Sequence, residues 1–173
     1  FISHRGMKRS QGSDKFKTMR FMLILVLPLV SLLASVVAHA ASEPVCITKS
    51  NVSLRKGPGT KFPVSWAVPK YMPFLALERK GAWVKVQDLD GKTHWVRSNA
   101  ISSKLSCAVV KTKTAKLRQG PGDDQPLAEL ATASKYTAFL RVDRDGEWIQ
   151  VKDDFEGMSW IHETNVWIPT VRA

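Results

Sequence analysis

The chain repeats one motif, and this repeat limits what it can fold into. Leu54–Gly59 (LRKGPG) recurs as Leu117–Gly122 (LRQGPG), so position 54 corresponds to position 117 at this motif. Trp83–Val86 (WVKV) then returns as Trp148–Val151 (WIQV), and another Trp-aliphatic pair follows each copy. Self-similarity in a fixed order indicates a tandem array of small modules, here two of about 60 residues each.

Residues 1–40 stand apart from both modules. Phe21–Ala38 is an uncharged apolar run, preceded by basic side chains and followed by the small-residue triplet Ala38–Ala40. This order is typical of a secretory signal peptide that is cleaved after the triplet, which predicts an exported protein, periplasmic or extracellular. A retained membrane anchor is the alternative, because the run is marginally long enough to span a bilayer. The chain opens on Phe1 rather than Met, so an over-extended start covering residues 1–6 also stays open.

The two modules differ in charge. The formal net charge of +11 includes the N-terminal segment. Residues 46–106 carry 11 basic and 3 acidic side chains (+8), whereas residues 107–173 carry 9 and 10 (−1). A basic exported module tends to meet anionic polymers or membrane surfaces, with a merely soluble surface as the equal alternative. Nucleic acid is not an expected partner of an exported chain.

Short strand signals fill both modules. Trp83–Asp88 alternates apolar and polar residues, as a half-buried strand does, and the Asp-Gly pair after it is a tight-turn signal. The second module repeats this plan. Leu127–Lys135 has a helical composition, but its alignment with the first module favours a strand and turn. The prediction is an all-β fold of two small barrels, each with five or six short strands.

The two cysteines, Cys46 and Cys107, each stand just before the first strand signal of a module. Export implies an oxidising compartment in which disulfides persist. The ends of a small barrel usually lie close together, so we predict a Cys46–Cys107 disulfide, worth about 4 kcal/mol in the loop-entropy account. Two free thiols are the alternative. A catalytic cysteine is disfavoured because neither residue has a histidine nearby in sequence.

Three segments together resemble the bacterial SH3-like domain. They are Asn51–Gly59, Trp83–Val86 and Asp90–Val96, which follow the family pattern N-V-R-x-G-P-G, W-x-K-V and D-G-x-x-G-W-V. The resemblance covers about residues 46–168. It implies SH3-like barrels in an exported protein. Members of this family are often attached to cell-wall hydrolases, where they help to bind peptidoglycan or its peptides.

The expected boundaries are 1–40 for the signal peptide, 46–102 for the first SH3-like domain and 107–168 for the second. Two positions depart from the family pattern: the usual glycine before the last Trp is His94 in the first module and Ser159 in the second. The second module also has an acidic segment where the first has Thr-Lys-Phe-Pro. The ligand of the second module is therefore expected to differ or to be absent.

The Gly-Pro-Gly bend has a mechanical explanation. The proline ring fixes its own φ angle, and the flanking glycines are free to take positive φ, so a tight bend is expected. A phosphate-binding loop is disfavoured, because no helix and no Gly-Lys-Ser/Thr sequence follow. Arg55 and Arg118, just before the bend, are expected to tie down the loop more than to bind a ligand.

The predicted ligand-binding residues of the first module are aromatic side chains and one arginine: Phe62, Trp66, Tyr71, Trp95 and Arg97. Aromatic side chains in a groove offer a large contact area. Trp66 and Tyr71 are favoured because the second module has Glu129 and Ser134 near those positions. For the two Trp of the strand motifs, a core position is the stronger alternative.

These features predict a non-catalytic exported module that binds peptidoglycan or another cell-envelope component. The alternative is a periplasmic protein–protein interaction or scaffold module, which could use an exposed strand edge or a groove. An enzyme is not expected, because the two modules hold only two histidines, His94 and His162, and no metal-ligand spacing. No cofactor is expected, and no stable membrane anchor after signal cleavage.

Overall fold

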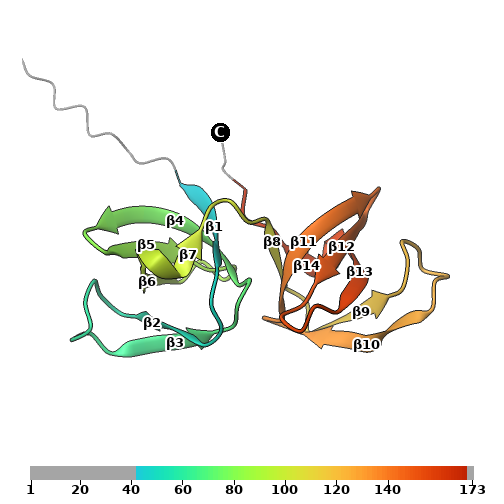
Figure 1. Cartoon of the computed structure of the whole chain (residues 1–173), viewed down its shortest axis with the longest axis horizontal. Coiled ribbons are helices and arrows are strands. Elements are labelled where there is room, and N and C mark those ends of the chain that lie inside the picture. The colour runs from blue at the N-terminus through green and yellow to red at the C-terminus, as the bar shows by residue number, and fades with distance from the viewer. Residues whose placement is uncertain (1–41, 171–173) are drawn as a thin grey trace, which may run out of the picture. The chain divides into compact units, whose positions relative to one another are not determined.

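Two seven-stranded antiparallel sheets and two short 3₁₀ turns make up the part of the chain that the computed structural model describes, residues 42–170 (Figure 1). All of these residues belong to one unit of the chain. The all-β prediction is confirmed, although each sheet has seven strands instead of five or six. The predicted signal peptide, residues 1–40, lies outside the described residues. None of the described helices is long and apolar enough to cross a membrane.

The first sheet makes up the first module, Glu43–Ser102. Its spatial strand order is β3-β2-β6-β5-β4-β1-β7. A 3₁₀ turn, η1 (Ser98–Ala100), precedes the last strand. The strands are β1 (Glu43–Ile47), β2 (Val52–Arg55), β3 (Val64–Val68), β4 (Pro73–Lys80), β5 (Trp83–Gln87), β6 (Thr93–Arg97) and β7 (Ile101–Ser102).

The second sheet makes up the second module, Cys107–Trp167, and repeats this order as β10-β9-β13-β12-β11-β8-β14. The turn η2 (Glu163–Asn165) corresponds to η1. The strands are β8 (Cys107–Val110), β9 (Thr114–Arg118), β10 (Leu127–Ser134), β11 (Ala138–Asp145), β12 (Trp148–Lys152), β13 (Met158–His162) and β14 (Val166–Trp167).

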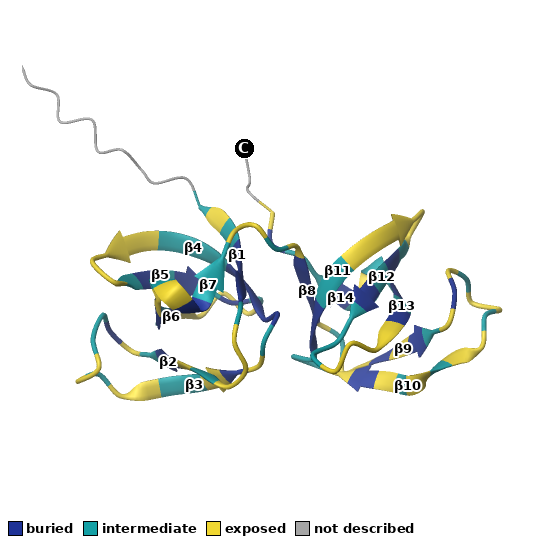
Figure 2. Cartoon of the chain, in the orientation of Figure 1, coloured by how far each residue is buried: buried dark blue, intermediate teal, exposed yellow. Residues whose placement is uncertain are grey.

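The alternation of buried and exposed residues along the strands shows where the core lies. Buried residues lie along strands of both modules (Figure 2). In β5 and β6, every second residue is buried, so Val84, Val86 and Val96 point inward. They pack with the fully buried Leu54 and Phe74 in the core of the first module. A second cluster, which includes Leu117, Phe139 and Ile149, forms the core of the second module.

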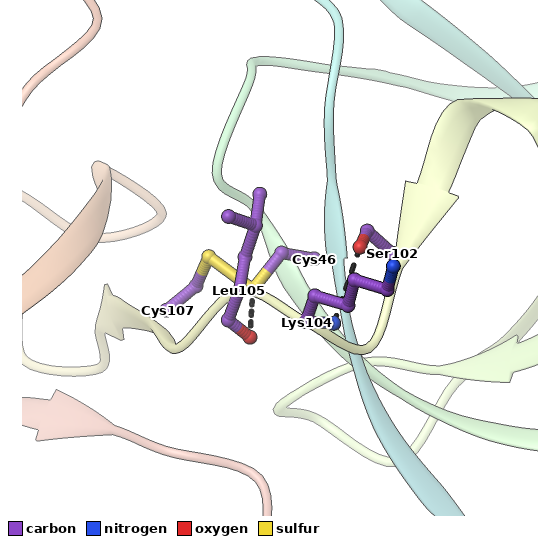
Figure 3. Close-up of a disulfide and its surroundings, with 5 residues drawn as sticks. All are labelled: Cys46, Ser102, Lys104, Leu105 and Cys107. Carbon is purple, nitrogen blue, oxygen red and sulfur yellow. Dashed lines mark hydrogen bonds between the residues drawn. A yellow bond between two sulfur atoms is a disulfide. The ribbon is translucent and has the colours of Figure 1, made fainter.

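The predicted disulfide between Cys46 and Cys107 is present, with a Cα–Cα distance of 6.1 Å (Figure 3). Both cysteines lie within strands and not before them, since Cys46 is in β1 and Cys107 begins β8. The carbonyl oxygen of Leu105 lies 3.2 Å from Cys46 Sγ, and the backbone N–H of Lys104 donates to Ser102 Oγ, so the connecting segment follows the bridge closely (Figure 3). The bond therefore holds the first strands of both modules together.

The bend after β2 is held by its arginine, as predicted. Arg55 Nη1 donates to the carbonyl oxygens of Thr60 at 3.0 Å and Phe62 at 2.7 Å. Gly57 is required for space and not for its φ angle, because a Cβ atom there would lie 2.4 Å from the Phe62 ring. Of the four glycines in the two bends, only Gly122 has a positive φ, at 152°.

The modules also meet through side chains. Lys70 of the first module pairs with Asp154 of the second at 3.1 Å, and Ser50 Oγ donates to the same carboxylate at 2.6 Å. In the opposite direction, Lys135 of the second module pairs with Asp90 of the first at 3.0 Å. The contacts with Ser50 and Lys70 hold the pKa of Asp154 below its usual value.

Candidate functional site

The outward face of β5 and β6 brings two tryptophans together. Opposed residues of an antiparallel pair share one face of the sheet, and Trp83 is paired with Arg97, while Lys85 is paired with Trp95. The Arg97 guanidinium carbon lies 5.1 Å from the Trp83 ring centroid, a cation–π distance. Both tryptophans are half-buried, so they lie on the sheet surface and not in the core, which corrects the core alternative.

Neighbouring strands add charge to this face. Arg55 on β2 is paired with Trp95, while Lys80 and Glu78 on β4 are paired with Trp83 and Lys85. We call these seven residues the aromatic–basic face: Arg55, Glu78, Lys80, Trp83, Lys85, Trp95 and Arg97. Its four basic side chains and one acidic side chain give a charge of +3. The face therefore combines aromatic contact surface with positive charge.

The second module has the same two tryptophans with different neighbours. Trp148 is paired with His162 and Trp160 with Gln150, so His162 and Gln150 stand where the first module has Arg97 and Lys85. The β11 partners of Trp148 and Gln150 are both aspartates, Asp145 and Asp143. Arg118, paired with Trp160, is the one basic residue among these positions. With one basic and two acidic side chains, the charge is −1, counting His162 as neutral.

The five predicted ligand-binding residues do not form one cluster. Trp95 and Arg97 lie on the aromatic–basic face, and the Phe62 carbonyl is tied to that face through Arg55. Trp66 lies on β3, where its ring contacts Phe74, His94 and Tyr136. Tyr71 is only 5% exposed and has a φ angle of 67°. Their roles in binding remain predictions.

Strand register revises how the two modules align. Val68 is paired with Val52, and Ala133 with Ala115, so position 68 corresponds to position 133 at this strand. The counterpart of Trp66 is therefore Ala131 and not Glu129. Tyr71 corresponds to Tyr136 and not to Ser134, and both tyrosines have positive φ angles, at 67° and 71°.

Sequence reasoning missed Lys80 and Lys85 as members of the face. It named Trp83 as a groove candidate but favoured a core position for it. The signal was present in the alternation of β5. Trp83 and Lys85 are two residues apart and therefore lie on the same side of the strand, whereas the two buried valines lie on the other side. A strand that places Lys and Trp on the same side is expected to expose that side.

A polar trio closes a gap on the first module. Ser65 Oγ on β3 lies 2.8 Å from His94 Nδ1 on β6, and His94 Nε2 lies 3.3 Å from Asp88 Oδ2. Asp88 Oδ1 accepts the backbone N–H groups of Asp90 and Lys92 and so fixes the β5–β6 turn. The trio lines a cavity of about 280 Å³ with Trp66, Lys92 and Tyr136. We interpret it as a clamp between the edge strand and β6.

The corresponding gap of the second module exposes large apolar side chains. Its cavity of about 560 Å³ is lined by Leu130 on β10, Phe155 in the β12–β13 turn and Met158 on β13, among others. Asp153 fixes that turn as Asp88 does, because its Oδ1 accepts the backbone N–H groups of Phe155 and Gly157. The aspartate that fixes the turn beside the gap is thus present in both modules, whereas the side chains that line the gap differ.

The part of the chain that the structure describes holds no group of three or more His, Cys, Asp or Glu residues arranged to bind a metal ion.

Two curated relatives are similar to part of this chain. Both are named "Probable cell wall amidase LytH" and come from two strains of Staphylococcus epidermidis. Each is 33% identical over 92 residues, which is 49% of this chain and 32% of the relative. The chain therefore spans about a third of the length of the curated relatives it matches.

Several solved structures are similar to this chain at low identity. NlpC1 from Trichomonas vaginalis has 10% identity and a TM-score of 0.34, covering 75% of this chain and 46% of that one. An NlpC/P60 family protein from Bacillus cereus has 13% identity and a TM-score of 0.32, with coverages of 75% and 57%. The structure titled "Endolysin LysPBC5 CBD" has 14% identity and a TM-score of 0.30, with coverages of 76% and 96%.

The family comparison concerns the first module. Residues 48–103 match the family described as bacterial SH3 domain. This range includes β2 to β7 and therefore both tryptophans of the aromatic–basic face.

Proposed function

We propose that this chain is a non-catalytic, exported binding protein that recognises peptidoglycan or another anionic component of the cell envelope through the aromatic–basic face. The observation that carries the proposal is the pair Trp83 and Trp95 among four basic side chains. Indole rings offer contact surface to sugars and peptides, while the cations attract anionic groups.

Two comparisons support this proposal. The match to the bacterial SH3 domain covers the module that carries the face. The curated relatives are named as probable cell wall amidases, and the similar region is about a third of their length. A binding module appended to a wall enzyme fits both findings. The amidase activity in that name is not part of the proposal for this chain.

The test is sedimentation of residues 41–173 with purified sacculi at increasing salt. The test variant carries Lys85→Gln and Arg97→His, which introduces the residues of the second module. We expect about three- to tenfold weaker binding and a weaker salt dependence, because two cations at an exposed face are removed. The matched control carries Gln150→Lys and His162→Arg, which add the two cations of the first module to the equivalent face of the second module.

Unchanged binding by the test variant would contradict the assigned face. Release of soluble wall fragments by the purified chain would contradict the non-catalytic proposal. The alternative function, a periplasmic interaction or scaffold module, would be favoured if sacculi fail to bind while a protein partner is retained. One observation supports that alternative independently: the large apolar side chains exposed at the gap of the second module.

A further inference from the structure

Three large, exposed apolar side chains of the second module gather at one groove. Phe155 is 92% exposed, Leu130 48% and Met158 47%, and all three line the 560 Å³ cavity between β10 and the β12–β13 turn. Soluble proteins rarely expose several large apolar side chains side by side unless the surface binds something. The aromatic–basic face does not include these residues.

The groove is open because of two sequence differences between the modules. In the first module, His94 spans the gap to Ser65, and the Trp66 ring packs against His94. In the second module, the short Ser159 occupies the position of His94, and Ala131 occupies that of Trp66. The side chains that close the first gap are thus absent from the second.

An insertion in β10 supplies one wall. β3 has five residues and β10 has eight, and the pairing of β10 with β9 shifts between Leu127 and Thr132. The extra residues fall within this irregular stretch, and Ala128, Glu129 and Leu130 line the groove. Irregular strand segments of this kind often re-aim side chains at binding sites.

The same strand offers backbone hydrogen bonds. β10 is the terminal strand of its sheet and, among the described strands, pairs with β9 alone. An edge strand presents N–H and C=O groups to which another extended chain can add. An apolar groove beside such an edge accepts the alternate side chains of an added strand.

Charge indicates which peptide would bind. Glu129 is exposed in the groove wall, and no Lys or Arg of the described residues forms an ion pair with it. Asp123 and Asp124 are exposed in the loop that leads into β10, although Asp123 contacts Arg118. Within the groove itself, the lining contains two carboxylates, Glu129 and Asp153, so it complements basic side chains.

We propose that the second module binds an extended peptide segment of a partner protein along β10. Alternate apolar side chains of this peptide enter the groove formed by Leu130, Phe155 and Met158, and a Lys or Arg next to them faces Glu129. The site is distinct from the aromatic–basic face, so its occupation does not depend on wall binding.

The test is panning of a random library of peptides of about seven residues, roughly the length that spans β10, against residues 41–173. We expect enrichment of sequences with alternating apolar residues and at least one Lys or Arg. A synthetic peptide from the enriched pool should bind Phe155→Ser about tenfold more weakly, since a large apolar contact is lost. Phe155 is almost fully exposed, so this variant should fold normally.

Val142→Ser is the matched control, because Val142 is 50% exposed on β11 and does not line the groove. It should bind the peptide as the original chain does. Glu129→Lys should weaken peptides that carry Lys or Arg and spare uncharged ones. No enrichment, or equal binding by Phe155→Ser, would overturn the proposal. A concentration-dependent dimer that Phe155→Ser abolishes would also overturn it, because the occupant would then be a second copy of the chain.

Discussion

The first and second modules share a strand order and a bend, yet their surfaces differ at two equivalent places. The face over β5 and β6 has a charge of +3, whereas its counterpart over β12 and β13 has −1. The gap beside the edge strand is clamped by Ser65 and His94 in the first module, whereas in the second it is open and exposes large apolar side chains. The two modules share buried apolar residues such as Leu54 and Leu117 and the two outward tryptophans, whereas the charged side chains of the face and the side chains of the gap differ.

This difference indicates at which positions the fold tolerates amino-acid substitution. Leu54 and Leu117 are both fully buried and occupy the same place in the repeated motif. Asp88 and Asp153 both fix a turn through backbone hydrogen bonds. In contrast, side chains that stand outward from the sheet make few contacts that the barrel requires, so their replacement costs little stability.

The largest expected effect concerns the link between the two modules. Replacing both Cys46 and Cys107 with Ala removes a cross-link with a sequence separation of 61. The loop-entropy account predicts a loss of about 4 kcal/mol in the free energy of unfolding. Urea denaturation followed by Trp fluorescence measures it. A change below about 1 kcal/mol would mean that the other contacts already hold the modules together.

The glycines of the two bends give a matched pair. In Gly57→Ala, the new Cβ would lie 2.4 Å from the Phe62 ring, which is stiff, and we expect a cost of about 1–3 kcal/mol. In Gly120→Ala, the nearest atom is Gln125 Oε1 at 2.8 Å, at the end of a flexible side chain, so the cost should be smaller. Thermal unfolding of both variants compares them. Equal losses would contradict the role assigned to the Phe62 ring.

The clamp can be converted into its counterpart. His94→Ser introduces the residue of the second module and removes the hydrogen bonds to Ser65 and Asp88. We expect a loss of about 1–2 kcal/mol and a more open gap beside β3. Urea denaturation measures the first effect, and hydrogen exchange of the Ser65 and Trp66 amides measures the second. Unchanged exchange would show that the clamp does not close this gap.

The smallest expected effect is a loss of folding stability at acidic pH. Hydrogen bonds from Tyr136 and Lys135 hold the pKa of Asp90 below its usual value, and the pKa of Asp154 is shifted in the same direction by Ser50 and Lys70. A depressed pKa in the folded state stabilises the fold above the unfolded value, near 3.8, and this stabilisation is lost as the pH falls through the lower folded value.

Stability should therefore decline below about pH 4, and Asp90→Asn with Asp154→Asn should flatten that decline. Both carboxylates are about one-third exposed, so solvent screening keeps the effect small. Thermal unfolding between neutral and acidic pH measures it. A steeper decline in the double variant would contradict the assignment.

The sequence predicts the barrel plan well because its signals are local. Trp83–Gln87 alternates as a strand, and Gly91 takes a positive φ of 79° in the expected Asp-Gly turn. The disulfide could be predicted from the two cysteines and the expected export. The prediction that Leu127–Lys135 is a strand is confirmed by β10, despite its helical composition. Here the partner strand outweighs intrinsic preference.

The site was harder to predict because it depends on register. The extra residues of the second module lie inside β10, and alignment by the bend motif alone placed Ser134 against Tyr71. Only the pairing of β9 with β10 reveals that Tyr136 is the true counterpart of Tyr71. The Ser65–His94 contact is likewise invisible in sequence, since the two side chains come from strands that are far apart along the chain.

The side-chain contacts between the modules have a consequence for symmetry. Lys70 and Lys135 occupy equivalent positions, and each reaches the β5–β6 or β12–β13 turn of the other module. A contact in which the same corner meets the same turn in both directions is the pattern of a two-fold dimer interface. A chain with only one such module would carry both halves of the contact and could pair with a copy of itself. In this protein, the duplicated chain supplies that second copy permanently.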